Sequence, residues 1–472
     1  MQIVVRFEVW NALILIFAQF DLPEGLTSSG QMLSEKTDEK IKDRLRTALS
    51  RARAETDALF QILKARGMYE RPIAERHRII FYLGHLEAFD WNMIAQQAFG
   101  MRSFHPSFDK LFAFGIDPVD GRLPQDAAAD WPSIDEILEY NSRVRKSVDH
   151  LLDTAVFSSV HPMLDRGLIF HVAIEHRFMH AETLAYMFNF LPYDLKVPLP
   201  VAVPDSTPSV RNRPVEIPKG LATLGLRRSP ESPFGWDNEF EEQVVDVPAF
   251  SIDAYNVTNR EFLRFIDEGG YQQRSLWTQP GWEWISTNSI THPKFWVPHG
   301  DRFSFRGMFS EVPLPLDWPV YVSHTEASAY ARWVGKALPT EAQYHRAAFG
   351  TPGVERWYPW GNEGPRPEHG NFDFRQWTPL PVGSFPRGDS AFGISDLMGN
   401  GWEWTSTVFH PFPGFERFPF YPGYSADFFD GNHFVLKGAS FRTSSMLLRR
   451  SFRNWFQPYY PNVYGKFRCV EN

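Results

Sequence analysis

The sequence predicts an α+β protein of two domains, in which a bundle of helices is followed by a turn-rich domain of mixed structure. Apolar residues recur at intervals of three and four through most of 38–190, which is the period of an amphipathic helix. Beyond a proline-rich segment, short aromatic and apolar runs are separated by Gly, Pro and Asn. A chain of 472 residues is also too long for one common core, so two domains are expected.

The first 37 residues are expected to be a leader that does not belong to the folded unit. The run 9–18 is apolar, but it is shorter than the roughly 20 residues that a membrane span needs. Arg6 and Glu8 precede it, and the basic leader of a signal peptide would not contain the glutamate. We therefore expect no membrane segment. A start of translation near Met32 is the alternative interpretation.

Four helices are expected between residues 38 and 191. The segment 102–132 is rich in Pro, Gly and Asp and is expected to be a long crossing loop between the second and third helices. Four helices with one connection much longer than the others are typical of a four-helix bundle, whose facing helices can carry metal ligands. The expected helices are 38–66, about 73–99, a third that begins at Ser133, and about 163–190.

Residues 192–218 are expected to link the domains, because this segment contains seven prolines and can be neither a helix nor a central strand. The second domain is then 219–472. Helices are expected at 323–334 and 340–349 within an otherwise irregular α+β arrangement. No repeat of fixed period is visible.

The composition limits the classes of function. Hydrophobic residues make up 43% and charged residues 22% of the chain, as in globular proteins, and a net charge of -8 gives no basic footprint for a nucleic acid. The one cysteine, Cys469, excludes an internal disulfide and a cysteine-rich zinc site. We therefore expect a cytoplasmic protein with no nucleic acid partner.

Three histidines form a candidate metal site. His176 and His180 are four residues apart in a helical pattern, so both imidazoles project from one face. His85, in the second expected helix, is the candidate third ligand. Three imidazoles suit zinc, iron, nickel or copper and leave coordination positions open for water, oxygen or substrate, which is typical of catalysis. From the pair alone, ordinary helix histidines are an equally good interpretation.

Several short motifs carry a resemblance to known families. The second domain resembles the formylglycine-generating-enzyme-like domain, which has a C-type-lectin-like fold, and the helical region with its three histidines resembles the DinB-like domain. Their fusion resembles the ergothioneine sulfoxide synthase (EgtB) family, which includes the selenoneine synthase (SenA) branch. The motifs of the second domain are Val257-Thr258-Asn259-Arg260-Glu261-Phe262, Ala329-Tyr330-Ala331-Arg332-Trp333, Leu338-Pro339-Thr340-Glu341-Ala342, Tyr358-Pro359-Trp360-Gly361-Asn362 and Met398-Gly399-Asn400-Gly401-Trp402-Glu403-Trp404-Thr405.

The resemblance implies a non-haem iron(II) enzyme that uses oxygen to join the sulfur of a thiol, or the selenium of a selenosugar, to the imidazole ring of hercynine (trimethylhistidine). It implies that His85, His176 and His180 hold the iron. Three neutral ligands keep the site cationic, which favours an anionic sulfur or selenium donor. The trimethylammonium group has no hydrogen-bond donor, so its best protein partner is an aromatic face.

The resemblance also implies the substrate residues. Trp455 matches the tryptophan of the family's substrate site. Phe409 occupies the position of a tyrosine that donates a proton in the best-studied branch, and Phe412 occupies a second tyrosine position. Phe456 replaces an aspartate and Met179 a glutamine of that branch. We therefore expect a less polar substrate site formed by Trp455, Phe412, Phe409 and Phe456, with no assigned proton donor.

The finer branch stays open, as do two of three alternative functions. The chain end and the loop 111–118 resemble the branch that includes selenoneine synthase. Formylglycine generation needs a pair of cysteines that this chain lacks. The bundle alone also suits a zinc-dependent thiol transferase. The second domain alone suits a non-catalytic lectin-like binding protein. The sequence does not give the donor or the oligomeric state.

Overall fold

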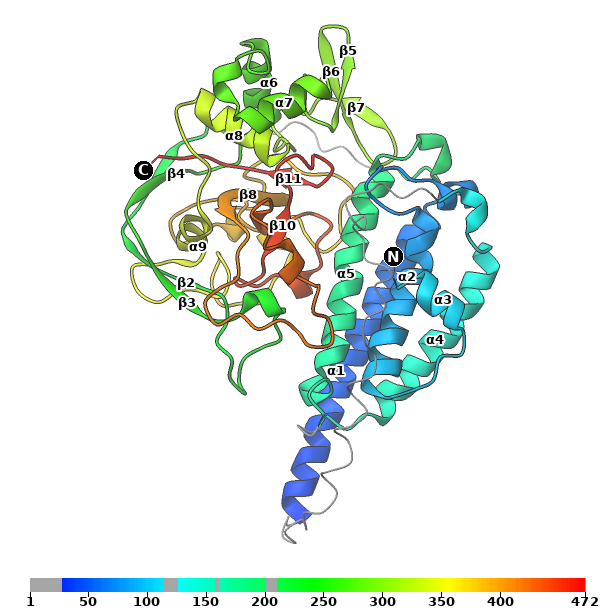
Figure 1. Ribbon diagram of the computed structural model, residues 1–472. Helices are drawn as coiled ribbons and strands as arrows, with labels where there is room; N and C mark the ends of the chain where they lie inside the picture. Colours follow the sequence, from blue (N-terminus) through cyan, green and yellow to red (C-terminus); the bar gives the residue numbers. More distant parts are fainter. Residues whose placement is uncertain (1–27, 114–125, 158–160, 201–209, 472) are drawn as a thin grey trace, which may run out of the picture.

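The computed structural model describes residues 28–113, 126–157, 161–200 and 210–471. A helical domain and a domain of mixed structure lie side by side (Figure 1), and the predicted α+β fold class is confirmed. Much of the expected leader (1–27), the middle of the expected linker (201–209) and part of the loop 111–118 lie outside the described residues.

The helical domain contains the four long helices expected from the sequence. Helix α1 packs against α5, and α2 packs against α4. The helices are α1 (Ser28–Gln61), α2 (Ile79–Asp90), α4 (Ile134–Thr154) and α5 (Leu168–Asn189), with the π-helical segment η2 (Trp91–Ala98) continuing α2.

Three boundaries differ from the expectation. Helix α1 begins ten residues before Asp38, and α2 begins six residues after residue 73. The segment 102–132 is not entirely loop, because it contains the short helix α3 (Pro106–Leu111). Pro106 stands at the first helical position, where its missing N–H is no loss, and the His105 ring accepts the Phe108 backbone N–H.

The second domain is built from short strands in several small sheets. The central sheet has the order β10-β9-β8-β11, and a second sheet has the order β1-β4-β12. Strand β2 pairs with β3 in a third sheet, and β5, β6 and β7 form a fourth. The strands are β1 (Pro214–Ile217), β2 (Gly220–Leu224), β3 (Gln243–Val247), β4 (Phe250–Asp253), β5 (Trp296–His299), β6 (Arg302–Arg306), β7 (Glu311–Pro313), β8 (Gly401–Val408), β9 (Phe434–Ala439), β10 (Asn454–Phe456), β11 (Gly465–Lys466) and β12 (Val470–Glu471).

Strand β1 lies inside the range that was expected to be linker. It pairs with β4 in antiparallel register at the edge of its sheet. Pro214 is the first residue of this edge strand, a position at which a proline costs no ladder hydrogen bond.

The four longer helices described in the second domain begin at side-chain N-caps, and three of them have capping boxes. Helices α8 (His324–Trp333) and α9 (Glu341–Phe349) correspond to the two expected helices. Helices α6 (Asn259–Asp267) and α7 (Gln279–Thr287) were not expected. The Thr258 side chain caps α6, and the Glu261 carboxylate accepts the backbone N–H of Thr258, so the motif Val257–Phe262 is a helix start.

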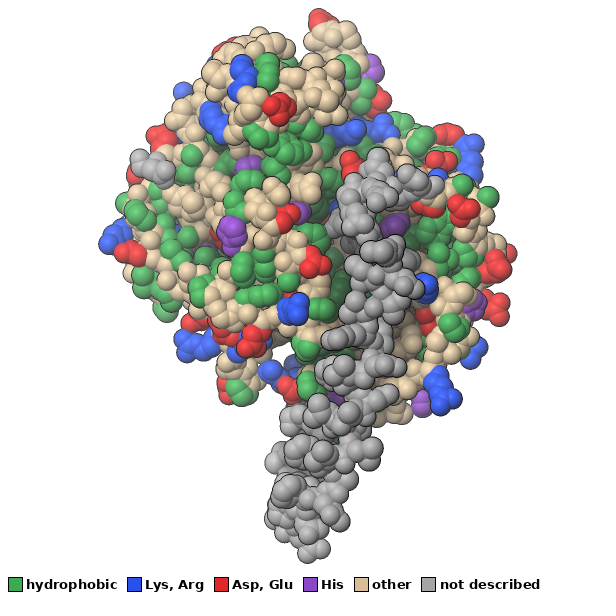
Figure 2. Space-filling view, viewed as in Figure 1, with side chains coloured by type: hydrophobic (Ala, Val, Ile, Leu, Met, Phe, Trp, Pro, Cys, Tyr) green, Lys and Arg blue, Asp and Glu red, His purple; other side chains and the backbone are tan. Residues whose placement is uncertain are grey.

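One hydrophobic cluster extends through both domains. It includes buried residues of α1, α2 and α5 together with Trp236, Trp402 and Phe452 of the second domain. The two domains therefore share a core. None of the described helices is long and apolar enough to cross a membrane. On the face that Figure 2 shows, basic and acidic side chains of the described residues are interspersed rather than gathered by sign.

Candidate metal and substrate site

His176 and His180 lie on the buried face of α5. Helix α5 is apolar around most of its circumference because it packs against α1 on one side and the second domain on the other. The exposed fractions of the two histidines are 4% and 2%, and their Nε2 atoms face each other at 3.0 Å. Two imidazoles that face each other in this way suit a cation between them.

His85 on α2 completes the group. The ligand nitrogens of the three histidines all lie within 4.8 Å of one another. The Nδ1 of His85 bonds to the carbonyl oxygen of Phe112 at 2.7 Å, which assigns the proton to Nδ1 and leaves Nε2 as the free ligand atom. The structure thus brings together the three residues that the sequence singled out.

The loop after α3 orients His85. A side chain at Gly84 would place its Cβ 2.6 Å from the Phe112 ring, so only glycine lets this loop approach α2 closely. The short helix α3, which the sequence did not predict, therefore has a functional consequence. It places the backbone carbonyl of Phe112 where it accepts the hydrogen bond from Nδ1 of His85.

The donor set fits a divalent transition metal. The Nε2 of His85 is buried and has no hydrogen-bond partner in the part of the chain that the structure describes. Burial lowers the pKa of His85 to about 4 and lowers the pKa values of His176 and His180 well below the usual value, which favours neutral imidazole. With metal–nitrogen bonds of about 2.1 Å, two ligands at right angles are about 3 Å apart, which matches the pair on α5.

A buried ion network stands directly behind the histidines. Arg177 donates to Glu87 at 3.0 and 2.7 Å and to Asp90 at 2.9 Å. Arg145 joins Glu87 to Asp57. Glu87 and Asp90 follow His85 on α2, and Arg177 follows His176 on α5. The network therefore ties together the two helices that carry the ligands.

Arg177→Met should lower the free energy of unfolding by about 3–5 kcal/mol, because it leaves the buried carboxylate of Asp90 without its cation and that of Glu87 with Arg145 alone. Urea denaturation in the presence of a chelator measures this stability without a contribution from metal. Arg46→Met is the matched control, since the exposed pairs of Arg46 should be worth less than about 1 kcal/mol. Equal stabilities of the two variants would contradict the importance of the network.

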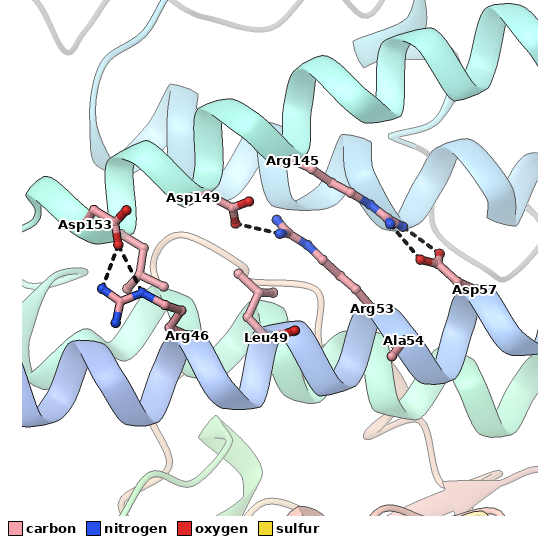
Figure 3. A pocket seen from close by; sticks show the side chains of 10 residues that line it. Arg46, Leu49, Arg53, Ala54, Asp57, Arg145, Asp149 and Asp153 are labelled. Carbon is pink, nitrogen blue, oxygen red and sulfur yellow. Dashed lines mark hydrogen bonds and ion pairs between the residues drawn. The ribbon is translucent and has the colours of Figure 1, made fainter.

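A groove with a volume of about 540 Å³ lies between α1 and α4 and is distinct from this site. Three arginine–aspartate pairs cross it, namely Arg46–Asp153, Arg53–Asp149 and Arg145–Asp57 (Figure 3). None of its lining residues is one of the three histidines. The groove is consequently a contact between α1 and α4 that salt bridges span. Arg145 connects it to the buried network, because this side chain bonds to both Asp57 and Glu87.

A chain of aromatic rings connects the histidines to the second domain. Phe89 stacks on His176 with ring centroids 3.5 Å apart and meets Tyr421 at 5.5 Å. Tyr421 lies 5.6 Å from Tyr424, which meets the edge of Trp455 at 5.5 Å. The hydroxyl of Tyr424 also reaches the sulfur of Met179, on α5, at 3.5 Å.

The four predicted aromatic residues occupy different places. Trp455 is partly exposed and stacks on the fully buried Phe409 at 4.3 Å. The guanidinium of Arg453 lies over the rings of Phe409 and Phe412, at 4.8 and 4.2 Å. Phe456 stacks on Tyr460 at 5.4 Å. Phe409 therefore supports Trp455 from one face, and Phe412 packs against Arg453.

Sequence reasoning missed four groups at the site. Phe89 stands four residues after His85 on the same helix, and this spacing could have identified it. The Phe112 carbonyl, Tyr421 and Tyr424 lie in irregular segments whose side-chain directions follow no period. No pattern in the sequence points to them.

The comparisons with known proteins cover both domains. Residues 201–472 match the Sulfatase-modifying factor enzyme 1-like domain, and residues 48–184 match the DinB superfamily. The hercynine oxygenase of Mycolicibacterium thermoresistibile is 38% identical over 308 residues, which are 64% of this chain and 68% of that protein. The hercynine oxygenase of Mycolicibacterium smegmatis is 36% identical over 338 residues, with 70% of this chain and 76% of that protein covered.

A fungal relative extends the match to most of the chain. Ergothioneine biosynthesis protein 1 of Neurospora crassa is 29% identical over 494 aligned positions, which cover 87% of this chain and 56% of that protein. The family resemblance that the sequence motifs carried is confirmed, whereas the selenoneine branch stays a prediction. With both domains matched and close identity to two hercynine oxygenases, this chain belongs to the EgtB-like family of hercynine oxygenases.

Proposed function

We propose that this protein is an iron(II)- and oxygen-dependent enzyme that joins a sulfur or selenium donor to the imidazole ring of hercynine. One observation carries the proposal. Three buried imidazoles converge on one point, and an aromatic chain from the second domain reaches that point through Phe89. One region thus contains imidazoles that suit a redox-active metal and aromatic rings that suit a quaternary ammonium group.

The proposed reaction balances in atoms and electrons. The donor loses the hydrogen on its sulfur or selenium, and the imidazole loses one ring hydrogen. One oxygen atom of O₂ ends in the S–O or Se–O bond of the product, and the other leaves as water with the two hydrogens. O₂ takes up four electrons, and the donor and the ring supply them.

The protein's own residues hold the reactants. His85, His176 and His180 would hold the iron, which would supply open positions for oxygen and the donor together with redox chemistry. The hydrogen bond to Phe112 keeps the His85 ring in place. Phe89 covers one face of His176 and excludes water there.

Trp455 is proposed to bind the trimethylammonium group of hercynine. Phe409 supports its ring from one face, and Tyr424 and Phe428 stand against it at 5.5 and 5.6 Å. These groups form an aromatic enclosure of the kind that recognises quaternary ammonium ligands. We propose Phe412, which packs against Arg453, and Phe456, which stacks on Tyr460, as further apolar residues of the substrate site.

The donor is the finer part of the proposal. Met179, Phe409 and Phe456 stand where another branch of the family has polar side chains, so the lining offers few hydrogen bonds to a polar donor. Burial raises the pKa of Tyr424 well above 10, so its hydroxyl stays protonated beside the Met179 sulfur. This soft, apolar environment suits a selenosugar or a thiol that binds through its chalcogen.

The test is a donor panel. Protein purified without oxygen and loaded with iron(II) is mixed with hercynine and a series of thiols and a selenosugar, oxygen is admitted, and the products are read by mass spectrometry. We expect an oxygenated carbon–sulfur or carbon–selenium adduct of hercynine with at least one donor. Zinc-loaded protein should form none. Turnover with zinc and without oxygen would indicate a thiol transferase, and iron-loaded protein that forms no adduct with any donor would contradict the proposal.

A further inference from the structure

Three polar side chains of α5 face the second domain at intervals of seven residues. They are Glu175, Glu182 and Asn189, and their exposed fractions are 4%, 8% and 3%. Seven residues are close to two full helical turns, so these side chains form one stripe along the helix, about 21 Å long. We call them the polar ladder. Asp and Glu side chains are almost never fully buried unless they are paired, so partners are expected for this stripe.

The first step of the ladder is a buried ion pair. Glu175 accepts hydrogen bonds from both terminal nitrogens of Arg449, at 2.8 and 3.0 Å. It also accepts the indole N–H of Trp236 at 2.8 Å. Two parallel bonds from one guanidinium restrict orientation as well as distance.

The second step lies two residues after His180. Glu182 accepts the indole N–H of Trp402 at 2.6 Å and the hydroxyl of Thr443 at 2.7 Å. Trp402 is on β8, and Thr443 follows β9, so the central sheet of the second domain holds this part of α5.

The third step closes the end of the helix. The side-chain amide of Asn189 donates to the carbonyl of Arg306 at 3.0 Å, and Arg306 donates through Nε to the carbonyl of Asn189 at 3.1 Å. Arg306 also reaches the carbonyl of Leu191 at 2.9 Å. A side chain of β6 therefore satisfies carbonyl groups that the helix end leaves open.

The ladder and the histidines are on one rigid helix but on different faces. His176 is one residue, and so about 100°, around the helix from Glu175. A rotation of α5 by about 10° would move an atom 5–6 Å from the axis by about 1 Å. Catalytic constellations tolerate displacements of about 0.5 Å. An apolar contact alone is not directional and would permit such a rotation.

We propose that the polar ladder sets the rotation and axial position of α5, so that Trp402, Thr443, Arg449 and Arg306 act as positioning residues for the metal ligands His176 and His180. The inference rests on the proposed metal site. The second domain then does more than bind substrate, since it also fixes the geometry of two ligands that belong to the first domain.

A matched pair of threonines tests the proposal in the full-length protein. Thr443 and Thr405 are both fully buried. The hydroxyl of Thr443 donates to Glu182 and accepts the backbone N–H of Ser440. The hydroxyl of Thr405 donates to the carbonyl of Val435 and accepts the backbone N–H of Thr407. Thr443→Val and Thr405→Val therefore remove equivalent groups, and only the first touches the ladder.

Each variant is measured for melting temperature, for iron(II) affinity and for the visible absorption bands of the cobalt(II)-substituted site. Thr443→Val should weaken iron binding by about tenfold, the lower end of what loss of a ligand-orienting partner causes, and should shift the cobalt bands. Thr405→Val should lower the melting temperature similarly but leave affinity and bands at the parental values. Thr443→Ser keeps the hydroxyl and should restore both.

The outcomes separate this proposal from the proposed function. Parental affinity and an unchanged cobalt spectrum in Thr443→Val would overturn the ladder as a positioning device. An equal loss of affinity in Thr405→Val would also overturn it, because the effect would then follow general destabilisation. A parent that binds metal but forms no hercynine adduct would contradict the function alone, and a parent that binds no metal would contradict both.

Discussion

His180→Ala should remove most of the bound iron and all oxygen-dependent turnover. The imidazole of His180 faces that of His176 at 3.0 Å and has an exposed fraction of 2%. Bulk water therefore has little access to this position and does not readily replace the imidazole as a ligand. Two histidines on different helices would remain, and a site with two ligands holds a divalent ion far more weakly than one with three. Iron per protein, measured after anaerobic desalting, is the direct readout.

His171→Ala is the matched control, because it makes the same substitution nine residues earlier on α5. His171 packs against Phe234 at 5.4 Å and is not part of the group of candidate ligands. It should keep the parental iron content. Full iron occupancy in His180→Ala would show that the three histidines are not the metal site.

Trp455→Ala should weaken hercynine binding by one to two orders of magnitude without loss of iron. A desolvated cation over an indole is worth about 2 kcal/mol, and this corresponds to about thirtyfold in affinity at about 1.4 kcal/mol per tenfold. Calorimetry on iron-loaded protein without oxygen measures the affinity. Trp455→Phe should recover part of it, since phenylalanine offers a smaller and weaker aromatic face.

Trp357→Ala is the control for this prediction. Trp357 belongs to the same domain, but 52% of its surface is exposed and its neighbour is Arg450 rather than the aromatic chain. Its loss should leave hercynine affinity unchanged. If Trp455→Ala binds hercynine as the parent does, the aromatic enclosure is only part of the core.

Local sequence patterns predicted the helices and the pairing of two histidines on one helix face, because these depend on a short period. The interval of four between His176 and His180 places both rings on one side of any helix that contains them. The third member of the group could be predicted because His85 stands in a strongly apolar helix that was expected to face the pair. The motifs of the second domain then indicated the family, and the family resemblance implies that such a group of histidines holds iron.

The remaining parts of the site depend on contacts that no local pattern contains. Thr443 is 261 residues from Glu182, and Arg449 is 274 residues from Glu175. Tyr424 lies in an irregular segment, and only the tertiary fold brings its hydroxyl to Met179. Helix α6 was the exception, because its capping box was present in the sequence and was not interpreted as one.

The structure gives a packing role to Phe409, which the family resemblance places at a tyrosine position. Phe409 is fully buried between Trp455 and Arg453, so the ring at this position serves packing. Hydroxyl groups on this side of the histidines come from Tyr421 and Tyr424.

The most direct test of the account is an anomalous diffraction map at the iron edge, from crystals grown without oxygen in the presence of iron(II) and hercynine. We predict a single iron peak within bonding distance of the Nε2 atoms of His85, His176 and His180, and density for the trimethylammonium group against Trp455. An iron peak elsewhere, or a peak at the histidines with hercynine bound away from Trp455, would contradict the proposed site between the two domains.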